Sequence, residues 1–209
     1  MRHLIIKELK EHAPFTGLGA VSGIILMFFF RRLSLDLAYN LFYTLHPIHV
    51  LLSALVTAAM YQKHKCGKAR KCSIWLLLVI GYLGSIGVAT LSDSLIPYLG
   101  EVMLDMPHRH VHLGFIEKPV LVNGMALVGI IIAYFNPMTK FPHYGHVFLS
   151  TWASLFHLLM AGAAALAWGS YAAVFIFLFI SVWIPCCISD IVFPLLFVKE
   201  DRAEISSTG

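Results

Sequence analysis

Charged residues are scarce in this chain of 209 residues: Asp, Glu, Lys and Arg together make up 12% of it. A soluble domain carries about twice that share. Hydrophobic residues instead reach 59%, and the mean hydropathy is +0.80. Apolar runs of about 20 residues, the length that crosses the hydrocarbon core of a bilayer, recur along the chain. The scarcity of charge excludes a soluble domain, and the sequence predicts an all-α, multi-pass integral membrane protein.

Cysteine is also scarce, with four residues in all. Cys66 and Cys72 are too far apart for a CxxC metal knuckle, and Cys186 and Cys187 are adjacent, so the pattern excludes a disulfide framework. The sequence lacks HExxH, GxSxG and the paired glutamates of membrane proteases, which disfavours those hydrolases. The net charge of +4 fits loops that face anionic lipid and carries no nucleic-acid signature.

Six apolar segments predict six membrane spans: residues 13–30, 45–61, 73–97, 119–135, 147–168 and 171–198. Eleven of the 15 Lys and Arg residues fall on one side of this topology, which places both termini in the cytoplasm. The first span ends at Arg31 and Arg32 without a small-residue cleavage site. We therefore expect a signal anchor rather than a cleavable signal peptide, and a location in the cell membrane if the source is prokaryotic.

An internal repeat divides the chain. A shift of 97 residues aligns HPIHVLLS (46–53) with HYGHVFLS (143–150), and LSDSLIPYL (91–99) with ISDIVFPLL (188–196). A shift of 106 aligns AVSGIILMFF (20–29) with ALVGIIIAYF (126–135). Polar residues that match within apolar helices favour two copies of a three-span unit, residues 1–105 and 106–209. Because three is odd, the second copy is expected to be inverted in the membrane, an architecture common among secondary transporters.

Each copy carries a polar stripe along its second span. Residues three and four apart share one face of a helix. The stripes consist of His46, His49, Ser53 and Thr57 in the first copy, and of His143, His146, Ser150, Ser154 and His157 in the second. Polar groups are costly in lipid, so we expect both stripes to face the interior of the bundle.

A carboxylate in each third span completes the pattern. The inversion predicts one group near each membrane face: His46, His49 and Asp93 near the outer face, and His143, His146 and Asp190 near the cytoplasmic face. The two His pairs would then lie about 30 Å apart. Two imidazoles and one carboxylate suit a divalent first-row ion such as zinc, iron, manganese, cobalt or nickel.

One further histidine and one loop are also candidate functional sites. His157 stands where the first copy has Met60, and it is either a satisfied core histidine or a gate or proton carrier. The loop after the third span is expected to lie outside and to collect cations before they enter. Its candidate ligands are Glu101, His108, His110, His112 and Glu117.

The mirrored groups favour a transporter or channel for a divalent transition-metal cation over an enzyme. Metal binding requires neutral imidazole, so protons compete with the ion and proton-coupled exchange follows. The alternatives are an integral membrane metalloenzyme, specifically a hydrolase, and a haem-binding electron carrier, which the expected 30 Å between the His pairs disfavours. A purely structural or lipid-handling protein is a further alternative. The expected partners are the lipid bilayer, metal ions and protons. The sequence leaves open whether the chain forms a homo-oligomer.

Overall fold

The computed structural model describes residues 2–30, 33–66, 73–138, 140–162, 166–188 and 193–196, and all regular structure in these ranges is helical. The long helices are α1 (Arg2–Phe29), α2 (Leu35–Tyr61), α3 (Ile74–Thr90), α6 (Pro119–Phe135), α7 (Lys140–Met160) and α8 (Ser170–Cys187). The short helical segments are η1 (Gln62–Cys66), η3 (Leu91–Leu95), α4 (Ile96–Met103), α5 (Gly114–Glu117) and α9 (Phe193–Leu196).

Three helical stretches in the described part of the chain are long and apolar enough to cross a membrane: His12–Phe29, Leu35–Lys65 and Ile74–Met103. Pro119–Phe135 and Ser170–Cys186 are shorter apolar helices. The chain is therefore helical and has the segments of a membrane protein.

Several helix boundaries differ from the predicted spans, among them those of α2 and α7. α2 begins at Leu35 instead of residue 45, because Ser34 caps it by accepting a hydrogen bond from the backbone N–H of Leu37 at 3.3 Å. α7 covers Lys140–Met160, whereas the sequence predicted 147–168. It ends before Gly162, which has a φ of +100°, a conformation that few other residues adopt.

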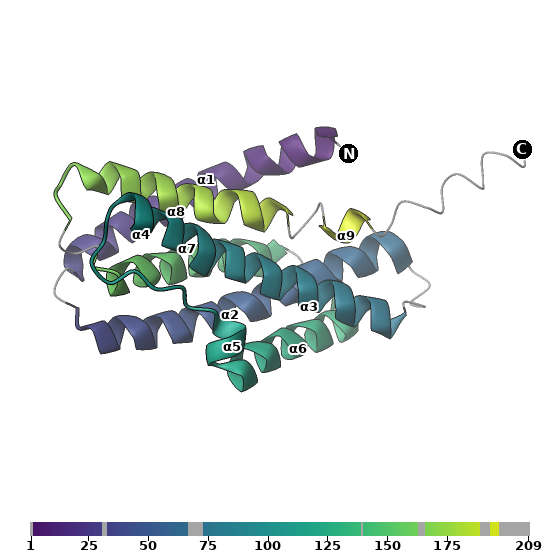
Figure 1. The fold of residues 1–209 in the computed structure, drawn as a ribbon. Helices are drawn as coiled ribbons and strands as arrows, with labels where there is room; N and C mark the ends of the chain where they lie inside the picture. The colour runs from purple at the N-terminus through teal and green to yellow at the C-terminus, as the bar shows by residue number, and fades with distance from the viewer. Residues whose placement is uncertain are drawn as a thin grey trace, which may run out of the picture.

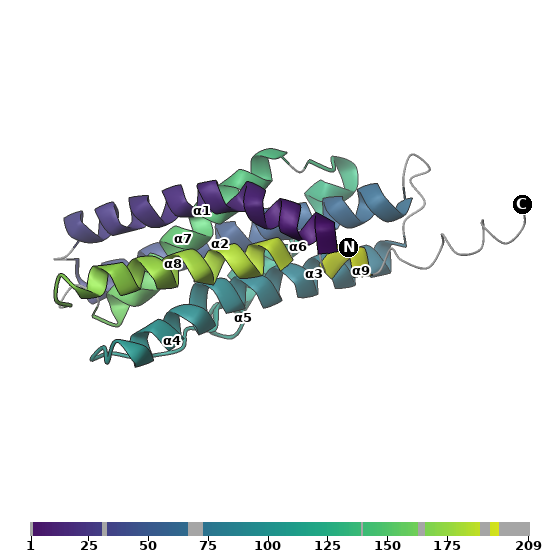
Figure 2. The same cartoon turned by 90° about the horizontal axis from the view of Figure 1, so that it is seen from above.

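Figures 1 and 2 show the long helices side by side along a common axis, with the start of α1 and α9 at the same end. α2 and α7 form the most extensive pair. α2 also packs on α6 and α3, and α7 packs correspondingly on α1 and α8, while α1 pairs with α8 as α6 does with α3. Each contact of the first three helices thus has a counterpart among α6, α7 and α8.

The polar stripes lie inside the bundle and apolar side chains cover its outside. The described stripe residues, namely His46, His49, Ser53, Thr57, His146, Ser150, Ser154 and His157, are all buried. Large apolar side chains such as Leu18, Trp75 and Val120 are exposed at 61%, 75% and 88%. The prediction that the stripes face the interior is confirmed for these side chains, and the exposed apolar surface is of the kind that lipid covers.

The third helical stretch widens into a π-helical turn, η3, at LSDSL. Pro97 follows it in the first turn of α4. Proline has no N–H to donate to the carbonyl four residues earlier, here that of Asp93, so the regular α-helical pattern cannot continue through this position. Ser154 on α7 donates its hydroxyl to the carbonyl oxygen of Ser92 at 2.9 Å. A neighbouring helix therefore supports the widened turn.

The chain after α4 turns back into the bundle instead of forming a free loop. In Figure 1 its teal trace runs from α4 to α5 alongside the helices. The hydroxyl of Ser94 donates to the carbonyl oxygen of His112 at 2.6 Å. Ser94 lies nine residues before the end of α4 at Met103, about 13 Å along a helix. This part of the segment therefore packs on the bundle, because buried Ser94 holds the backbone of His112.

Candidate metal centre

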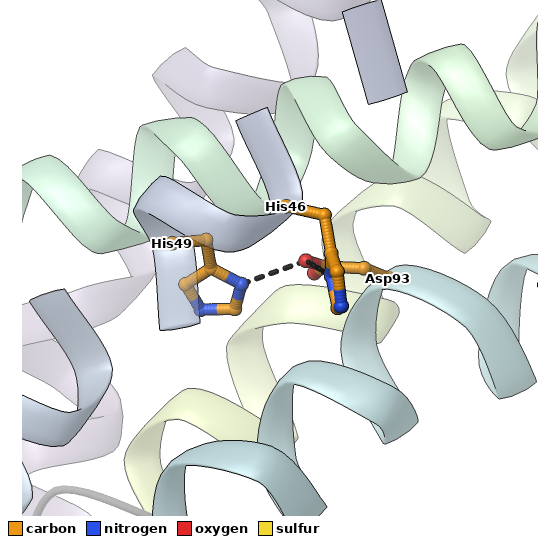
Figure 3. Close-up of side chains that lie close together, drawn as sticks. All are labelled: His46, His49 and Asp93. Atoms are coloured by element: carbon orange, nitrogen blue, oxygen red, sulfur yellow. Dashed lines mark hydrogen bonds and ion pairs between the residues drawn. The ribbon is translucent and has the colours of Figure 1, made fainter. Parts of the chain in front are cut away.

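Two histidines of α2 and one aspartate of η3 meet inside the bundle. Nδ1 of His46 and Nδ1 of His49 lie 2.8 Å and 2.7 Å from the same atom, Oδ2 of Asp93. All three side chains are buried, with 1%, 0% and 0% exposed. Figure 3 shows both rings turned toward this one carboxylate. The spacing of three residues on α2 puts both rings on one face, and η3 carries Asp93 against that face.

The other carboxylate oxygen of Asp93 also has two hydrogen-bond donors. Oδ1 of Asp93 accepts hydrogen bonds from the hydroxyls of Ser92 and Ser150, each at 2.7 Å. Ser150 belongs to α7, so the carboxylate joins the two halves of the chain. Four donors on one buried carboxylate offset much of the cost of removing its charge from water.

The hydrogen bonds leave Nε2 of each ring as the acceptor nitrogen. An ionised carboxylate only accepts, so each Nδ1 donates its proton and the lone pair of a neutral ring is at Nε2. Nε2 of His49 is buried and has no hydrogen-bond partner among the described residues. A buried polar atom in that position costs about 1–3 kcal/mol. A ligand that accepts the lone pair, such as a metal ion, would remove this cost.

The donor set fits a transition-metal ion. His46, His49 and Asp93 each offer a ligand atom, and these atoms lie within 4.8 Å of one another. In a tetrahedral zinc site with bond lengths of about 2.0–2.1 Å, neighbouring ligand atoms lie about 3.3 Å from one another. If the Nδ1 atoms bind the ion, the group must open slightly. If the Nε2 atoms bind it, Asp93 orients both rings from behind, as carboxylates commonly do for metal-bound histidine.

His146 lies beside this group and not at the opposite membrane face. Its ring stacks on that of His49, with centroids 5.8 Å apart and planes at 16°. The predicted separation of about 30 Å is therefore wrong for this pair. The reason is the early start of α2: His49 lies fourteen residues after Leu35, about 21 Å into the helix. The two residues that the repeat makes equivalent meet near the middle of the bundle.

The predicted cytoplasmic group has two further members. The side chain of His143 and the whole of Asp190 lie outside the described residues. The short distance between His49 and His146 also removes the reason given above against haem.

A second set of titratable side chains, the outer group, lies toward the end of the bundle that holds α4. It consists of Glu101, His110, His112, Glu117 and His157. Nδ1 of buried His157 lies 2.6 Å from Oε1 of buried Glu101. Nδ1 of His112 lies 3.2 Å from Oε2 of Glu117, which also accepts a hydrogen bond from the hydroxyl of Tyr43 at 2.6 Å.

The structure selects among the loop residues that the sequence proposed as ligands. His110, His112 and Glu117 offer ligand atoms within 4.8 Å of one another. Glu101 instead pairs with His157 and accepts from the backbone N–H of His110 at 3.3 Å. His108 is exposed, and its backbone N–H bonds to the carbonyl of Ala161 at 3.1 Å, so it does not belong to this set.

Burial and hydrogen bonding shift two pKa values in the outer group. Burial lowers the pKa of His112 below its ordinary value, although the hydrogen bond to Glu117 opposes this. Burial pushes the pKa of Glu117 upward, but hydrogen bonds from Tyr43 and His112 outweigh it and hold the pKa below its usual range. At neutral pH the pair is therefore a neutral imidazole and a carboxylate, the forms that bind a cation.

Several residues around the two groups escaped the sequence prediction. Phe42 is fully buried and stacks on His46, with centroids 5.2 Å apart and planes at 10°. Gly114 of α5 lies so close to His46 that a Cβ at that position would collide with Nε2 of the ring. Phe42 precedes His46 by four residues and continues the stripe by one turn. That spacing could have identified Phe42 from the sequence, whereas no sequence pattern pointed to Gly114.

Comparison with protein-family models, with curated proteins and with solved structures finds no match to this chain.

Proposed function

We propose that this protein is a secondary transporter of a divalent first-row transition-metal ion, with six spans built as two inverted repeats and with His46, His49 and Asp93 as its central ion site. The observation that carries this proposal is the meeting of two imidazoles and a carboxylate, all buried, where α2, η3 and α7 come together. Transporters with inverted repeats commonly bind their ions at such an interface, beside an interrupted helix.

Three features support the inverted repeat. Each packing contact between the long helices has a counterpart when α1, α2 and α3 are exchanged for α6, α7 and α8. α2 and α7 run antiparallel, since Phe42 contacts His157 while His49 contacts His146. π-Helical backbone begins at Leu91 and again at Ile188, which the shift of 97 residues makes equivalent. An inverted duplication accounts for all three together.

Burial of the site favours transport over hydrolysis. A hydrolase must bring a scissile bond of its substrate to the metal, whereas the three side chains here are at most 1% exposed. A bare ion needs far less room, and an occluded site is one stage of alternating access. Loading requires unprotonated nitrogens on His46 and His49, so ion binding and proton release are coupled.

Transport in proteoliposomes tests this function. Wild-type protein is expected to move at least one of zinc, iron, manganese, cobalt and nickel when a pH gradient is imposed. Asp93→Asn removes the shared carboxylate and is expected to abolish uptake, while Asp36→Asn, which changes an exposed acid in the first turn of α2, is expected to leave it intact. Failure of the wild type with all five ions, or uptake unchanged in Asp93→Asn, would contradict the proposal.

A further inference from the structure

The outer group departs from the internal repeat. Under the shift of 97 residues the central residues His46, His49 and Asp93 have His143, His146 and Asp190 as counterparts. Among the outer residues, Glu101 aligns with Val198 and His157 with Met60 under the same shift. Under the shift of 106 that relates the first parts of the two copies, His110 and His112 align with Leu4 and Ile6, and Glu117 aligns with Glu11. The duplicated fold therefore carries an additional set of ligand-type side chains, most of which lack a counterpart in the other copy. Packing of the repeat does not require it.

The outer group is organised in the same way as the central one. In both, a carboxylate oxygen binds Nδ1 of a histidine and leaves Nε2 on the other side of the ring. Nε2 of His157 is buried and has no hydrogen-bond partner among the described residues. The ring of His157 contacts that of His112, with centroids 5.3 Å apart. Carboxylate-oriented imidazoles with open Nε2 atoms are the usual form of metal-binding histidine.

The segment that carries His110 and His112 is held in place by the bundle. Glu101 accepts from the backbone N–H of His110, and Ser94 donates to the carbonyl of His112. Tyr43 of α2 fixes Glu117 through a hydrogen bond of 2.6 Å. These three contacts come from different helical segments and position the ligand atoms in advance. Preorganisation of this kind reduces the entropy lost when an ion binds.

One side chain separates the two groups. The ring of Phe42 stacks on His46 on the central side and meets the edge of His157, with centroids 5.5 Å apart, on the outer side. Phe42 also lies 6.1 Å from the ring of His112. An apolar ring in this position offers no ligand to a cation. The two groups are therefore distinct places for an ion and not one extended site.

We propose that His110, His112 and Glu117 form a second binding site for a divalent transition-metal ion, next to His157 and in series with the central site. The class of ion rests on the proposed function, because the two groups share their donor chemistry. The site stands at one end of the bundle only, since its two histidines have no ligand-type equivalents in the other repeat. It raises the local concentration of the ion on that side of Phe42.

Cobalt(II) binding to the purified full-length protein in detergent tests the outer site. Bound metal is counted by elemental analysis after equilibrium dialysis at neutral pH. His112→Ala/Glu117→Gln is expected to hold one ion fewer than wild type, and His49→Ala/Asp93→Asn also one fewer. His108→Ala, which changes an exposed histidine of the same segment, is the matched control and keeps the wild-type number. Circular dichroism verifies the helical content of each variant.

The outcomes separate the two proposals. If His112→Ala/Glu117→Gln keeps the wild-type number, the outer site is wrong and the central one stands. If His49→Ala/Asp93→Asn keeps that number while the outer variant loses an ion, the central assignment fails and the outer one stands. Loss of an ion in His108→Ala would mean unspecific binding to the segment and overturn the outer site. Should the outer double variant not fold, His110→Ala decides: the outer site is expected to weaken at least about tenfold, and unchanged affinity would overturn it.

Discussion

At the scale of single residues, Asp93 determines the geometry of the central group. It accepts two imidazole N–H groups on one oxygen and two hydroxyls on the other. Each of these donors comes from a stripe or a flanking position visible in the sequence. Their convergence on one carboxylate was not visible, because the position of Ser150 beside Asp93 depends on how α7 packs on η3.

Removal of one of these hydroxyls should weaken the group without deleting a metal ligand. In Ser150→Ala, Oδ1 of Asp93 keeps only Ser92, and the free energy of unfolding should fall by about 1–3 kcal/mol. Ion affinity should fall about 10- to 100-fold, as for other outer-shell partners. Titration calorimetry and thermal unfolding measure both. The control is Ser181→Ala, because among the described residues that buried hydroxyl bonds within α8, to the carbonyl of Leu178 at 3.0 Å. An equal loss of affinity in both variants would refute the role of Ser150.

Gly114 should be required for the position of His46. A Cβ at residue 114 would collide with Nε2 of the His46 ring, so Gly114→Ala must displace either the ring or α5. We expect ion affinity at the central site to drop by about tenfold or more, the loss that follows when an imidazole ligand is misplaced. Gly169→Ala, where a Cβ meets nothing within 4 Å, should bind normally. Wild-type affinity in Gly114→Ala would show that the ring contact is not required.

At the scale of helical elements, the spacing of polar residues revealed which face is buried but not where a helix starts. Leu35 to Thr44 reads LDLAYNLFYT, a mixture of polar and apolar residues that does not resemble a membrane span. The Ser34 cap and packing extend α2 through it. Because of that extension, His46 and His49 lie well inside α2, toward the middle of the bundle, and not at the expected start of the helix. The return of the chain after α4 was equally hidden, because it depends on the distant pair Ser94 and His112.

Most of the glycines on the first and third helical stretches lie at close contacts between helices. Cβ atoms at Gly19, Gly23, Gly81 and Gly84 would press against side chains of other helices, whereas one at Gly87 would meet nothing within 4 Å. The sequence could not separate these cases, since a small residue looks the same on a packed face and on an exposed one. Among the described glycines, the one whose added Cβ would come nearest to the backbone of another helix carried no signal in the sequence.

That glycine is Gly129 of α6, where an added Cβ would collide with the carbonyl oxygen of Leu51 on α2. A helix backbone cannot rotate away as a side chain can, so Gly129→Ala should force α6 from α2. We expect a loss of about 1–3 kcal/mol in stability, the usual cost of overpacking, seen as a lower Tm in detergent. Gly124→Ala on the same helix meets open space and should not lower Tm. A Gly129→Ala variant as stable as wild type would contradict the packing of these two helices.

At the scale of the whole molecule, the helices pair symmetrically but the polar interior does not. The exchange of α1, α2 and α3 with α6, α7 and α8 preserves the helix contacts. The outer group, Phe42 and the segment leading into α5 belong to one end alone. Under the repeat, Phe42 and Tyr43 align with Thr139 and Lys140. The sequence could reveal the duplication through its polar matches, yet the asymmetry emerges only when His157, Glu101 and His112 are brought together by the fold.

The asymmetry makes a directional prediction about Phe42. Its ring is fully buried between His46 and His157, so an ion leaving the central site toward the outer group must pass it. Phe42→Leu shortens this barrier while it keeps most of the apolar volume and hence the fold. In proteoliposomes loaded with cobalt(II), a membrane-impermeant chelator on the side of the outer group should extract the central ion about tenfold faster than from wild type, a barrier lower by about 1.4 kcal/mol.

Release toward the opposite side should stay at the wild-type rate, because Phe42 does not lie on that route. Phe28→Leu provides the control, since Phe28 of α1 is 52% exposed on the outside of the bundle and should change neither rate. Faster extraction from both sides would mean that the substitution loosens the whole bundle. Equal rates in Phe42→Leu and wild type would mean that the ion does not pass this ring, and the two groups would then not act in series.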